Sequence, residues 1–266
     1  MITTDFHLHS NHSGDCNTPT ETMILKGIEL GLTTMCFTQH QDFDYPLSDM
    51  FELNTDAYLY EFLLLKEKYK SKIKLLFGIE LGLQKHIASK NEAYANSYDF
   101  DFIIGSSHVA NKKDPYYPEF FQGRSEEDAF NEYFQATLDN IDSFQNYDVY
   151  GHLDYVVRYG PNGNLHYRYQ NHKDIIDEIL KSLINKGKGI EVNTSGFHKG
   201  LNATHPCKEI LNRYHELGGS IITIGSDAHF ADQIATKFDF VSDLLIECGF
   251  SYYTVFEKRQ ASFIKL

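Results

Sequence analysis

Short apolar runs rich in β-branched residues alternate with longer amphipathic segments along the chain. Runs of the first kind predict buried strands, and apolar residues three and four apart in the second kind predict helices. The predicted strands span residues 2–8, 33–38, 73–80, 100–105, 148–151, 189–193 and 220–225. The predicted helices span residues 18–30, 56–69, 125–144, 174–186 and 206–217. In the first helix, Thr18 is the predicted N-cap, with Pro19 in the first turn and Glu21 completing a capping box.

This order of elements indicates an α/β fold. Strands that alternate with helices form parallel sheets through right-handed crossovers. Seven such units without a break in composition favour a closed or nearly closed barrel, so we expect one domain over residues 1–266. An open doubly wound sheet is the alternative, because the sequence does not show whether the first and last strands meet. No glycine-rich phosphate loop follows a predicted strand, which removes the main reason to prefer that alternative.

Composition narrows the possible partners and the compartment. The 266 residues are 42% hydrophobic and carry a formal charge of −13, which argues against disorder and against a broad surface for nucleic acids or anionic membranes. The first residues lack a basic segment followed by an apolar one, and no later run is long enough to span a membrane, so a cytoplasmic protein is expected. The four cysteines lie far apart, which suggests neither a disulfide framework nor a thiolate zinc site.

Thirteen histidines make the chain unusual, and several fall at the carboxyl ends of predicted strands. Each of them alone would suit an ordinary surface position. In a parallel barrel, however, these strand ends share one face, so the side chains should converge. The residues of metal-ligand type at these positions are His7, His9, His40, Glu80, His108, His152, Asp227 and His229. So many ligand candidates exceed what one tetrahedral zinc needs, which predicts a polynuclear centre with a carboxylate such as Glu80 as a bridge.

Six motifs in this order resemble those of the polymerase and histidinol phosphatase (PHP) superfamily. They are HLHS at 7–10, FTQHQD at 37–42, GIE at 78–80, SSH at 106–108, GHLD at 151–154 and GSDAH at 225–229. The segment EVNTSG at 191–196 and an insert after His108 are similar to the histidinol-phosphate phosphatases within it. The resemblance implies a distorted seven-stranded (β/α)7 barrel of the TIM type, the PHP fold, with a trinuclear centre.

The resemblance also implies a ligand set for three divalent cations, which would be zinc, manganese or iron. His7, His9, Glu80 and Asp227 would hold the first cation, and Glu80, His108 and His152 the second. Asp15, His40 and His229 would hold the third. Asp15 stands where related proteins often carry histidine, and its harder oxygen favours manganese or iron at that position.

Hydrolysis of a phosphate monoester needs a nucleophile, charge neutralisation and a proton for the leaving alkoxide. A hydroxide that bridges the first two cations is the expected nucleophile, without a covalent phosphoenzyme, and Asp227 or His229 is a candidate proton carrier. Arg158 is the preferred phosphate ligand, with a surface salt bridge as the alternative. His198 and Lys199 lie at the same mouth, but family members often have arginine where His198 stands. Which of these two residues is the second phosphate ligand is therefore left open.

Several other residues near the predicted mouth have open roles. The insert at 109–123 is expected to be a lid, and its Tyr116, Tyr117, Phe120 and Phe121 are candidates to cover a substrate ring. Asp42, Asp44 and Glu119 could attract a substrate amine or imidazolium, although solvated acids are the simpler interpretation. His12 is a candidate phosphate contact. The remaining histidines, His86, His166, His172, His205 and His215, are expected at the surface or at helix caps.

The leading hypothesis is a histidinol-phosphatase, a metal-dependent enzyme that converts L-histidinol phosphate to L-histidinol and phosphate in L-histidine biosynthesis. The substrate comes from the resemblance alone, and the expected partner is a small phosphate monoester, with oligomeric state open. A PHP phosphoesterase for nucleotides or oligonucleotide ends is the alternative. A metal-dependent amidohydrolase ranks lower, because SSH at 106–108 stands where its usual bridging lysine would be. A PHP domain kept as a structural module would normally show lost ligands or attached domains.

Overall fold

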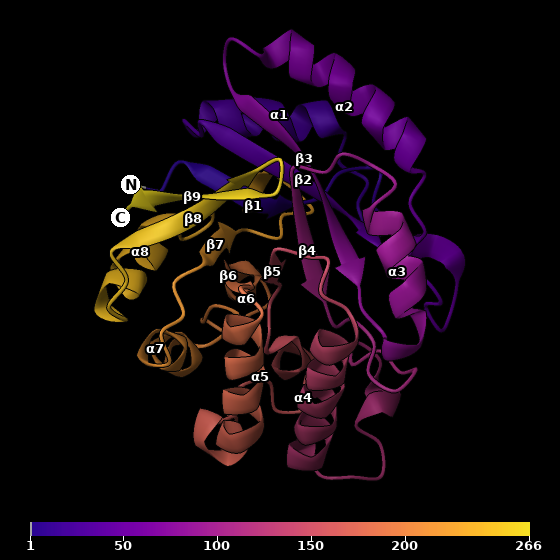
Figure 1. Ribbon diagram of the computed structural model, residues 1–266, viewed down its shortest axis with the longest axis vertical. Coiled ribbons are helices and arrows are strands. Elements are labelled where there is room, and N and C mark those ends of the chain that lie inside the picture. The colour runs from indigo at the N-terminus through magenta and orange to yellow at the C-terminus, as the bar shows by residue number, and fades with distance from the viewer. Residues whose placement is uncertain (1) are drawn as a thin grey trace.

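The computed structural model describes residues 2–266 and contains a sheet of seven parallel strands whose spatial order is their chain order (Figure 1). The strands are β1 (Thr4–Leu8), β2 (Thr34–Gln41), β3 (Lys74–Gly82), β4 (Phe102–Ser106), β5 (Val149–Tyr150), β6 (Gly189–Asn193) and β7 (Ile222–Gly225). The two outer strands also meet. The amide of Asp227, just after β7, donates to the carbonyl of His7 at 2.7 Å, and the amide of His9 donates to the carbonyl of Ala228 at 2.9 Å. The predicted nearly closed barrel is therefore confirmed, and the open doubly wound alternative is wrong.

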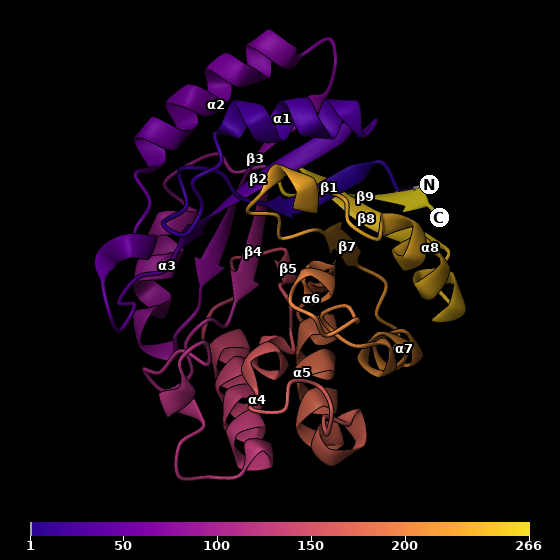
Figure 2. The same cartoon turned by 180° about the vertical axis from the view of Figure 1, so that it is seen from behind.

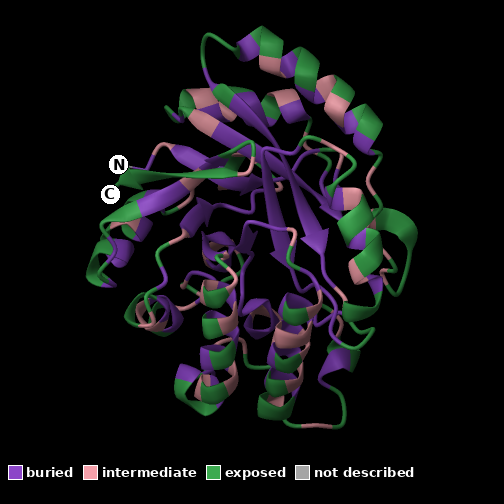
Figure 3. Cartoon of the chain, in the orientation of Figure 1, coloured by how far each residue is buried: buried purple, intermediate pink, exposed green. Residues whose placement is uncertain are grey.

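Helices lie around the outside of this barrel, as the two opposite views show, except the short helix Ser195–His198, which lies near the centre of both views (Figures 1 and 2). They are α1 (Thr20–Glu29), α2 (Thr55–Tyr69), α3 (Ala88–Ala95), α4 (Glu126–Ser143), α5 (Lys173–Asn185), α6 (Ser195–His198), α7 (Lys208–Glu216) and α8 (Phe238–Glu247). The strands are almost wholly buried, while the helices carry exposed residues on their outer sides (Figure 3). No helix within residues 2–266 is long and apolar enough to cross a membrane.

The predicted elements agree with these bounds to within three residues, but the predicted N-cap of α1 is wrong. The helix begins at Thr20 after Pro19, and Pro19 occupies the N-cap position without a side-chain hydrogen bond. The hydroxyl of Thr18 instead donates to the carbonyl of His229 at 2.8 Å. That bond ties the loop before α1 to the loop after β7, a tertiary contact that outweighs the local capping preference.

A C-terminal antiparallel hairpin, β8 (Tyr252–Glu257) and β9 (Gln260–Lys265), was not predicted and covers the amino end of the barrel. The ring of Phe256 packs against that of Phe102 of β4 at 5.2 Å between centroids, with the two ring planes inclined by 30°. At the hairpin turn, Arg259 Nε donates to Asp148 Oδ2 at 2.6 Å, just before β5. Since this end of the barrel is closed, the carboxyl ends of the strands form the accessible face.

Candidate metal centre

His7 and His9 project from the end of β1 into the barrel mouth with their rings fully buried. Their Nε2 atoms lie 3.1 Å apart. His7 Nε2 is 3.2 Å from Glu80 Oε2, and His9 Nε2 is 3.4 Å from Asp227 Oδ1. Asp227 has φ of 54°, a left-handed backbone that costs energy in a residue with a side chain, and its amide is held by the carbonyl of His7.

Glu80, near the end of β3, is the centre of the cluster, and its two oxygens face different histidines. Oε2 lies 3.2 Å from His7 Nε2, 3.6 Å from His9 Nε2 and 3.0 Å from His40 Nδ1. Oε1 lies 3.2 Å from His108 Nε2 and 2.9 Å from His152 Nε2. A carboxylate with its two oxygens divided in this way has the geometry of a bridge between two cations.

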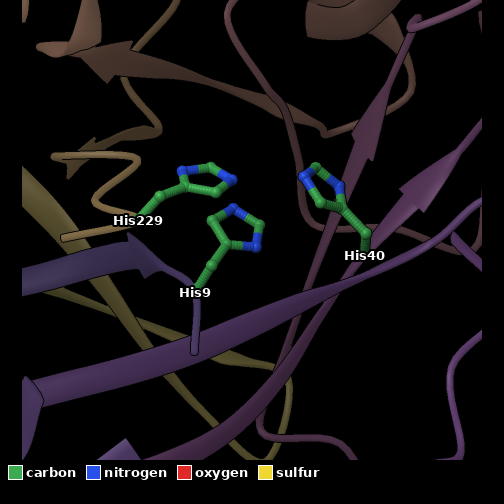
Figure 4. Close-up of side chains that lie close together, drawn as sticks. All are labelled: His9, His40 and His229. Carbon is green, nitrogen blue, oxygen red and sulfur yellow. The ribbon is translucent and has the colours of Figure 1, made fainter. Parts of the chain in front are cut away.

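A third group lies further out, where the rings of His9, His40 and His229 converge (Figure 4). The ring of His9 stacks on that of His40 at 4.2 Å between centroids and on that of His229 at 4.3 Å. Asp15 joins them from the loop before α1, with Oδ2 at 3.1 Å from His229 Nε2 and 3.7 Å from His40 Nε2. Asp15 is also the most exposed of the predicted ligands, at 37% of its side chain.

All nine predicted metal ligands therefore lie at one mouth. Three overlapping groups offer ligand atoms within 4.8 Å of one another: His9, His40 and His229; His7, His9 and Glu80; and His40, Glu80 and His108. Apart from Asp15, these residues were predicted to lie at or just beyond the carboxyl ends of strands, and the structure agrees for all but one of them. His40 belongs to β2 itself, because that strand extends to Gln41.

Charges within the cluster shift the pKa values of its members. Burial would lower the pKa of His7, but the charges of Glu191, Glu80 and Asp227 raise it well above its ordinary value. Burial together with His40 and His229 lowers the pKa of His9 to about 3. Burial would raise the pKa of Glu80, but His7, His108 and His40 hold it well below its usual range. The centre therefore contains an ionised carboxylate beside a neutral imidazole, which is the donor set of a divalent-cation site.

Hydrogen bonds on the far side of the rings support the same conclusion. His7 Nδ1 donates to Glu191 Oε1 at 2.6 Å, and its Nε2 faces His9. Ser13 donates its hydroxyl proton to Gln39 at 2.8 Å and therefore accepts from His9 Nδ1 at 2.9 Å. The raised pKa of His7 places a proton on its Nε2, which lies 3.1 Å from the Nε2 of the neutral His9, and a bound cation would replace that proton. The residues present thus fit a metal.

A cavity of about 400 Å³ opens above the cluster, and the predicted phosphate ligands line it. Arg158, from the 3-10 helix Tyr155–Tyr159, donates to the hydroxyl of Ser195 at the start of α6 and lies 3.6 Å from Asp227 Oδ2. Its side chain is only 5% exposed, so the alternative of a surface salt bridge is wrong. His198 and Lys199 also line the cavity, and burial lowers the pKa of His198.

The insert after β4 contributes only part of the expected lid. Tyr116 and Tyr117 line the cavity. Phe120 and Phe121 are buried instead, and Phe121 packs edge-on against Phe130 of α4 at 6.2 Å between centroids. Asp114 lines the cavity as well and accepts a hydrogen bond from the hydroxyl of Tyr45 at 2.6 Å. Sequence reasoning gave no role to this pair, because Tyr45 and Asp114 are 69 residues apart.

The three acids proposed as substrate contacts differ in burial and in their partners. Asp42 is buried and accepts from His108 Nδ1 at 2.6 Å. Asp44 is exposed and pairs with His86 at 3.4 Å and with Lys90 at 3.7 Å. Glu119 is exposed in the short helix Pro118–Phe120. Asp42 is thus not a solvated acid: its Oδ2 binds a ring of the centre, whereas its Oδ1 has no hydrogen-bond partner within residues 2–266 and the residue lines the cavity.

The histidines outside the centre also differ in burial and in their partners. His12 bonds Glu61 of α2. His205 and His172 were expected at the surface or at caps, and they are 1% and 3% exposed. His172 is the N-cap residue of α5, which agrees with the cap interpretation, whereas His205 is neither at the surface nor at a cap. His205 Nδ1 donates to Asp154 at 2.5 Å, and His172 Nδ1 donates to Asn131 at 2.6 Å. His86, His166 and His215 are exposed as expected.

Comparisons with known proteins agree with this site. The sequence pattern of the PHP domain matches residues 5–195. The histidinol-phosphatase of Lactococcus lactis is 34% identical over 95% of this chain and 93% of that protein, and the "probable histidinol-phosphatase" of Clostridium acetobutylicum is 32% identical over 96% and 97%. The crystal structure of the Lactococcus lactis histidinol phosphate phosphatase with zinc, L-histidinol and phosphate superposes with a TM-score of 0.92 and 33% identity, covering 98% of each chain.

Proposed function

This chain belongs to the PHP domain family, and we propose that it is a metal-dependent phosphatase that hydrolyses L-histidinol phosphate to L-histidinol and phosphate in L-histidine biosynthesis. The observation that carries the proposal is the convergence of nine ligand-type side chains beneath a cavity that also contains a buried arginine. The similar Lactococcus lactis enzyme, which binds zinc, L-histidinol and phosphate, supports the choice of substrate. Residues 1–266 would act as one domain.

The proposed ligand set holds three divalent cations, of zinc, manganese or iron. His7, His9, Glu80 and Asp227 would bind the first cation, and Glu80, His108 and His152 the second. Asp15, His40 and His229 would bind the third. The division of the Glu80 oxygens between two different sets of histidines supports its role as the bridge.

When bound, the cations would supply charge neutralisation and a bridging hydroxide as the nucleophile, since metal binding lowers the pKa of water from 15.7 to about 7. Arg158 would bind the phosphoryl oxygens, because a guanidinium matches a phosphate bidentately. Ser195 already orients this guanidinium. His198, whose buried Nε2 has no hydrogen-bond partner in residues 2–266, would complete the phosphate site together with Lys199.

The leaving alkoxide needs a proton, and Asp227 and His229 are the proposed carriers because both line the cavity. Tyr116 and Tyr117 would cover the substrate ring on the side away from the cations. This division of roles predicts that changes at Arg158 act on the phosphate and that changes at the two tyrosines act on the remainder of the substrate.

A substrate comparison tests the proposal. Protein reconstituted with zinc, manganese or iron is assayed for kcat/KM on L-histidinol phosphate, nucleoside monophosphates and p-nitrophenyl phosphate. We expect a preference of roughly 100-fold or more for L-histidinol phosphate, because a site with hydrogen bonds for one substrate rejects those that leave its groups unpaired. Equal or higher activity on nucleotides would favour the alternative phosphoesterase. No hydrolysis of any ester would favour a structural module.

A further inference from the structure

The histidine rings of the centre differ in the hydrogen bonds that they make on the side away from the centre. Three of them, His7, His9 and His108, use Nδ1 to donate a hydrogen bond away from the centre, at 2.6, 2.9 and 2.6 Å. For His7 and His108 the acceptor is a buried carboxylate, Glu191 and Asp42. A carboxylate behind a ligating imidazole fixes its tautomer and orientation and increases its basicity.

Glu191, on β6, holds two strand ends at once. Its Oε1 accepts from His7 Nδ1, and its Oε2 accepts from the backbone amide of His152 at 3.0 Å and from Asn193 Nδ2 at 3.1 Å. His7 is a proposed ligand of the first cation and His152 of the second. One carboxylate, 1% exposed, therefore holds the ring of a ligand of the first cation and the backbone of a ligand of the second. The ring nitrogen Nδ1 of His152 itself has no hydrogen-bond partner within residues 2–266.

Two glycines leave the space for these carboxylates. A Cβ atom on Gly225, at the end of β7, would lie 2.4 Å from Glu191 Oε1 and 2.3 Å from the Cβ of His7. A Cβ atom on Gly82, at the end of β3, would lie 2.4 Å from the carboxyl carbon of Asp42. Real Cβ atoms do not approach other atoms so closely, so each carboxylate occupies a space that only glycine provides.

The side chains of the outer group, which consists of Asp15, His40 and His229, make different contacts. His40 directs Nδ1 towards Glu80 and Nε2 towards Asp15, so both of its nitrogens face the centre. His229 Nδ1 contacts the backbone carbonyl of Asp227 in its own loop at 3.0 Å. The side chains of His229 and Asp15 are 20% and 37% exposed, whereas those of Glu191 and Asp42 are 1% and 5% exposed.

From this contrast we propose that Glu191 and Asp42 are positioning residues that make the two inner cation sites tight, and that the outer site at Asp15, His40 and His229 is the exchangeable one. The inference rests on the proposed cation assignment and adds to it an order of affinity. Glu191 supports both inner sites, and Asp42 supports only the second one, through His108.

Chelator titration of the zinc-loaded protein tests this order, with bound zinc per chain measured by elemental analysis. In the wild-type protein, one zinc should leave at a lower chelator concentration than the other two. Glu191→Gln should lower the affinity for two of the zinc ions by about 10- to 100-fold, and Asp42→Asn should lower the affinity for one zinc ion by the same factor. Asp15→Asn should lower the affinity only for the zinc ion that leaves first.

Asp154→Asn is the matched control, because Asp154 accepts a hydrogen bond from the buried ring of His205, which is not a proposed ligand. We expect this variant to release zinc as the wild-type protein does. The thermal midpoints of all zinc-free variants report whether each one folds. A wild-type protein that loses all of its zinc in one step, or an equal weakening in Asp154→Asn, would overturn the inference and leave the proposed phosphatase intact. A wild-type protein that binds no zinc and hydrolyses no ester would overturn both.

Discussion

The guanidinium of Arg158 lies 3.6 Å from the carboxylate of Asp227, and both side chains are less than 10% exposed. Burial would lower the pKa of Arg158, but Tyr159 and Asp227 raise it above its ordinary value, so the charge persists inside the cavity wall. A proposed phosphate ligand is thus held beside a proposed cation ligand. This arrangement links the anion site to the metal centre through a single carboxylate.

Arg158→Ala should lower kcat/KM for L-histidinol phosphate by well over roughly tenfold, because it removes a bidentate, charge-assisted phosphate contact. Steady-state kinetics of the metal-loaded variant measure the loss. Arg168→Ala is the control, since Arg168 is exposed and, within residues 2–266, donates only to the backbone carbonyls of Leu165 and Tyr167. A normal kcat/KM in Arg158→Ala would remove this residue from the site.

Glu80→Gln should reduce both bound metal and activity by roughly 100-fold or more, since the amide has one oxygen where the proposed bridge needs two. Zinc content and kcat are measured on the same preparation. Ser106→Ala provides a comparison, because the Ser106 hydroxyl donates to Glu80 Oε1 at 2.7 Å and its loss leaves both oxygens in place. If Glu80→Gln binds zinc as tightly as the wild-type protein, Glu80 does not bridge.

Removal of the cations should abolish hydrolysis and lower the thermal midpoint. Without cations, the Nε2 atoms of His7 and His9 remain 3.1 Å apart, and the burial of several charged groups is no longer compensated. Chelated protein should regain activity on addition of zinc, manganese or iron. A melting curve unchanged by chelator, in protein shown to be free of metal, would contradict the role of the cations in stability.

Asp177→Asn should lower the free energy of unfolding at pH 7 by about 2 kcal/mol through loss of its charge-assisted hydrogen bonds. Burial would raise the pKa of Asp177, but hydrogen bonds from Arg213, Tyr169 and Lys173 hold it below its ordinary value. Because the pKa is lower in the folded than in the unfolded chain, the stabilisation is complete above about pH 4 and is lost as pH falls further. Urea unfolding of both proteins at pH 7 and pH 3 measures it, and a pH-independent difference would contradict this account.

Arg259→Ala should lower the free energy of unfolding by about 2 kcal/mol, because it leaves the buried carboxylate of Asp148 without its cationic partner. Lys74→Ala is the matched control, because Lys74, at the start of β3, contacts the same hairpin through Glu257. Lys74 pairs with Glu257 at 2.6 Å with both side chains about half exposed, and such pairs contribute about 0 to 1 kcal/mol. Similar losses in the two variants would show that the hairpin turn is not held by Arg259.

The sequence predicted the barrel and the positions of the ligand candidates because both follow from local periodicity. Apolar runs defined the strands, and in a parallel barrel every strand end faces the same mouth, so His7 and His229 could be placed together across 222 residues. The N-cap at Thr18 and the surface position of His205 were wrong, because a partner distant in sequence decided each of them: the carbonyl of His229 and the carboxylate of Asp154.

The sequence by itself thus determined the order of the strands, the family and the residue types that meet at the barrel mouth. Only the tertiary structure decided which carboxylate faces which ring. Asp42 and Glu191 stand in segments that the sequence singled out, but their roles depend on distances of 2.6 Å to His108 and His7 across different strands. A hydrogen bond of that length depends on the twist and closure of the barrel and on the space left by two glycines, which no local pattern encodes.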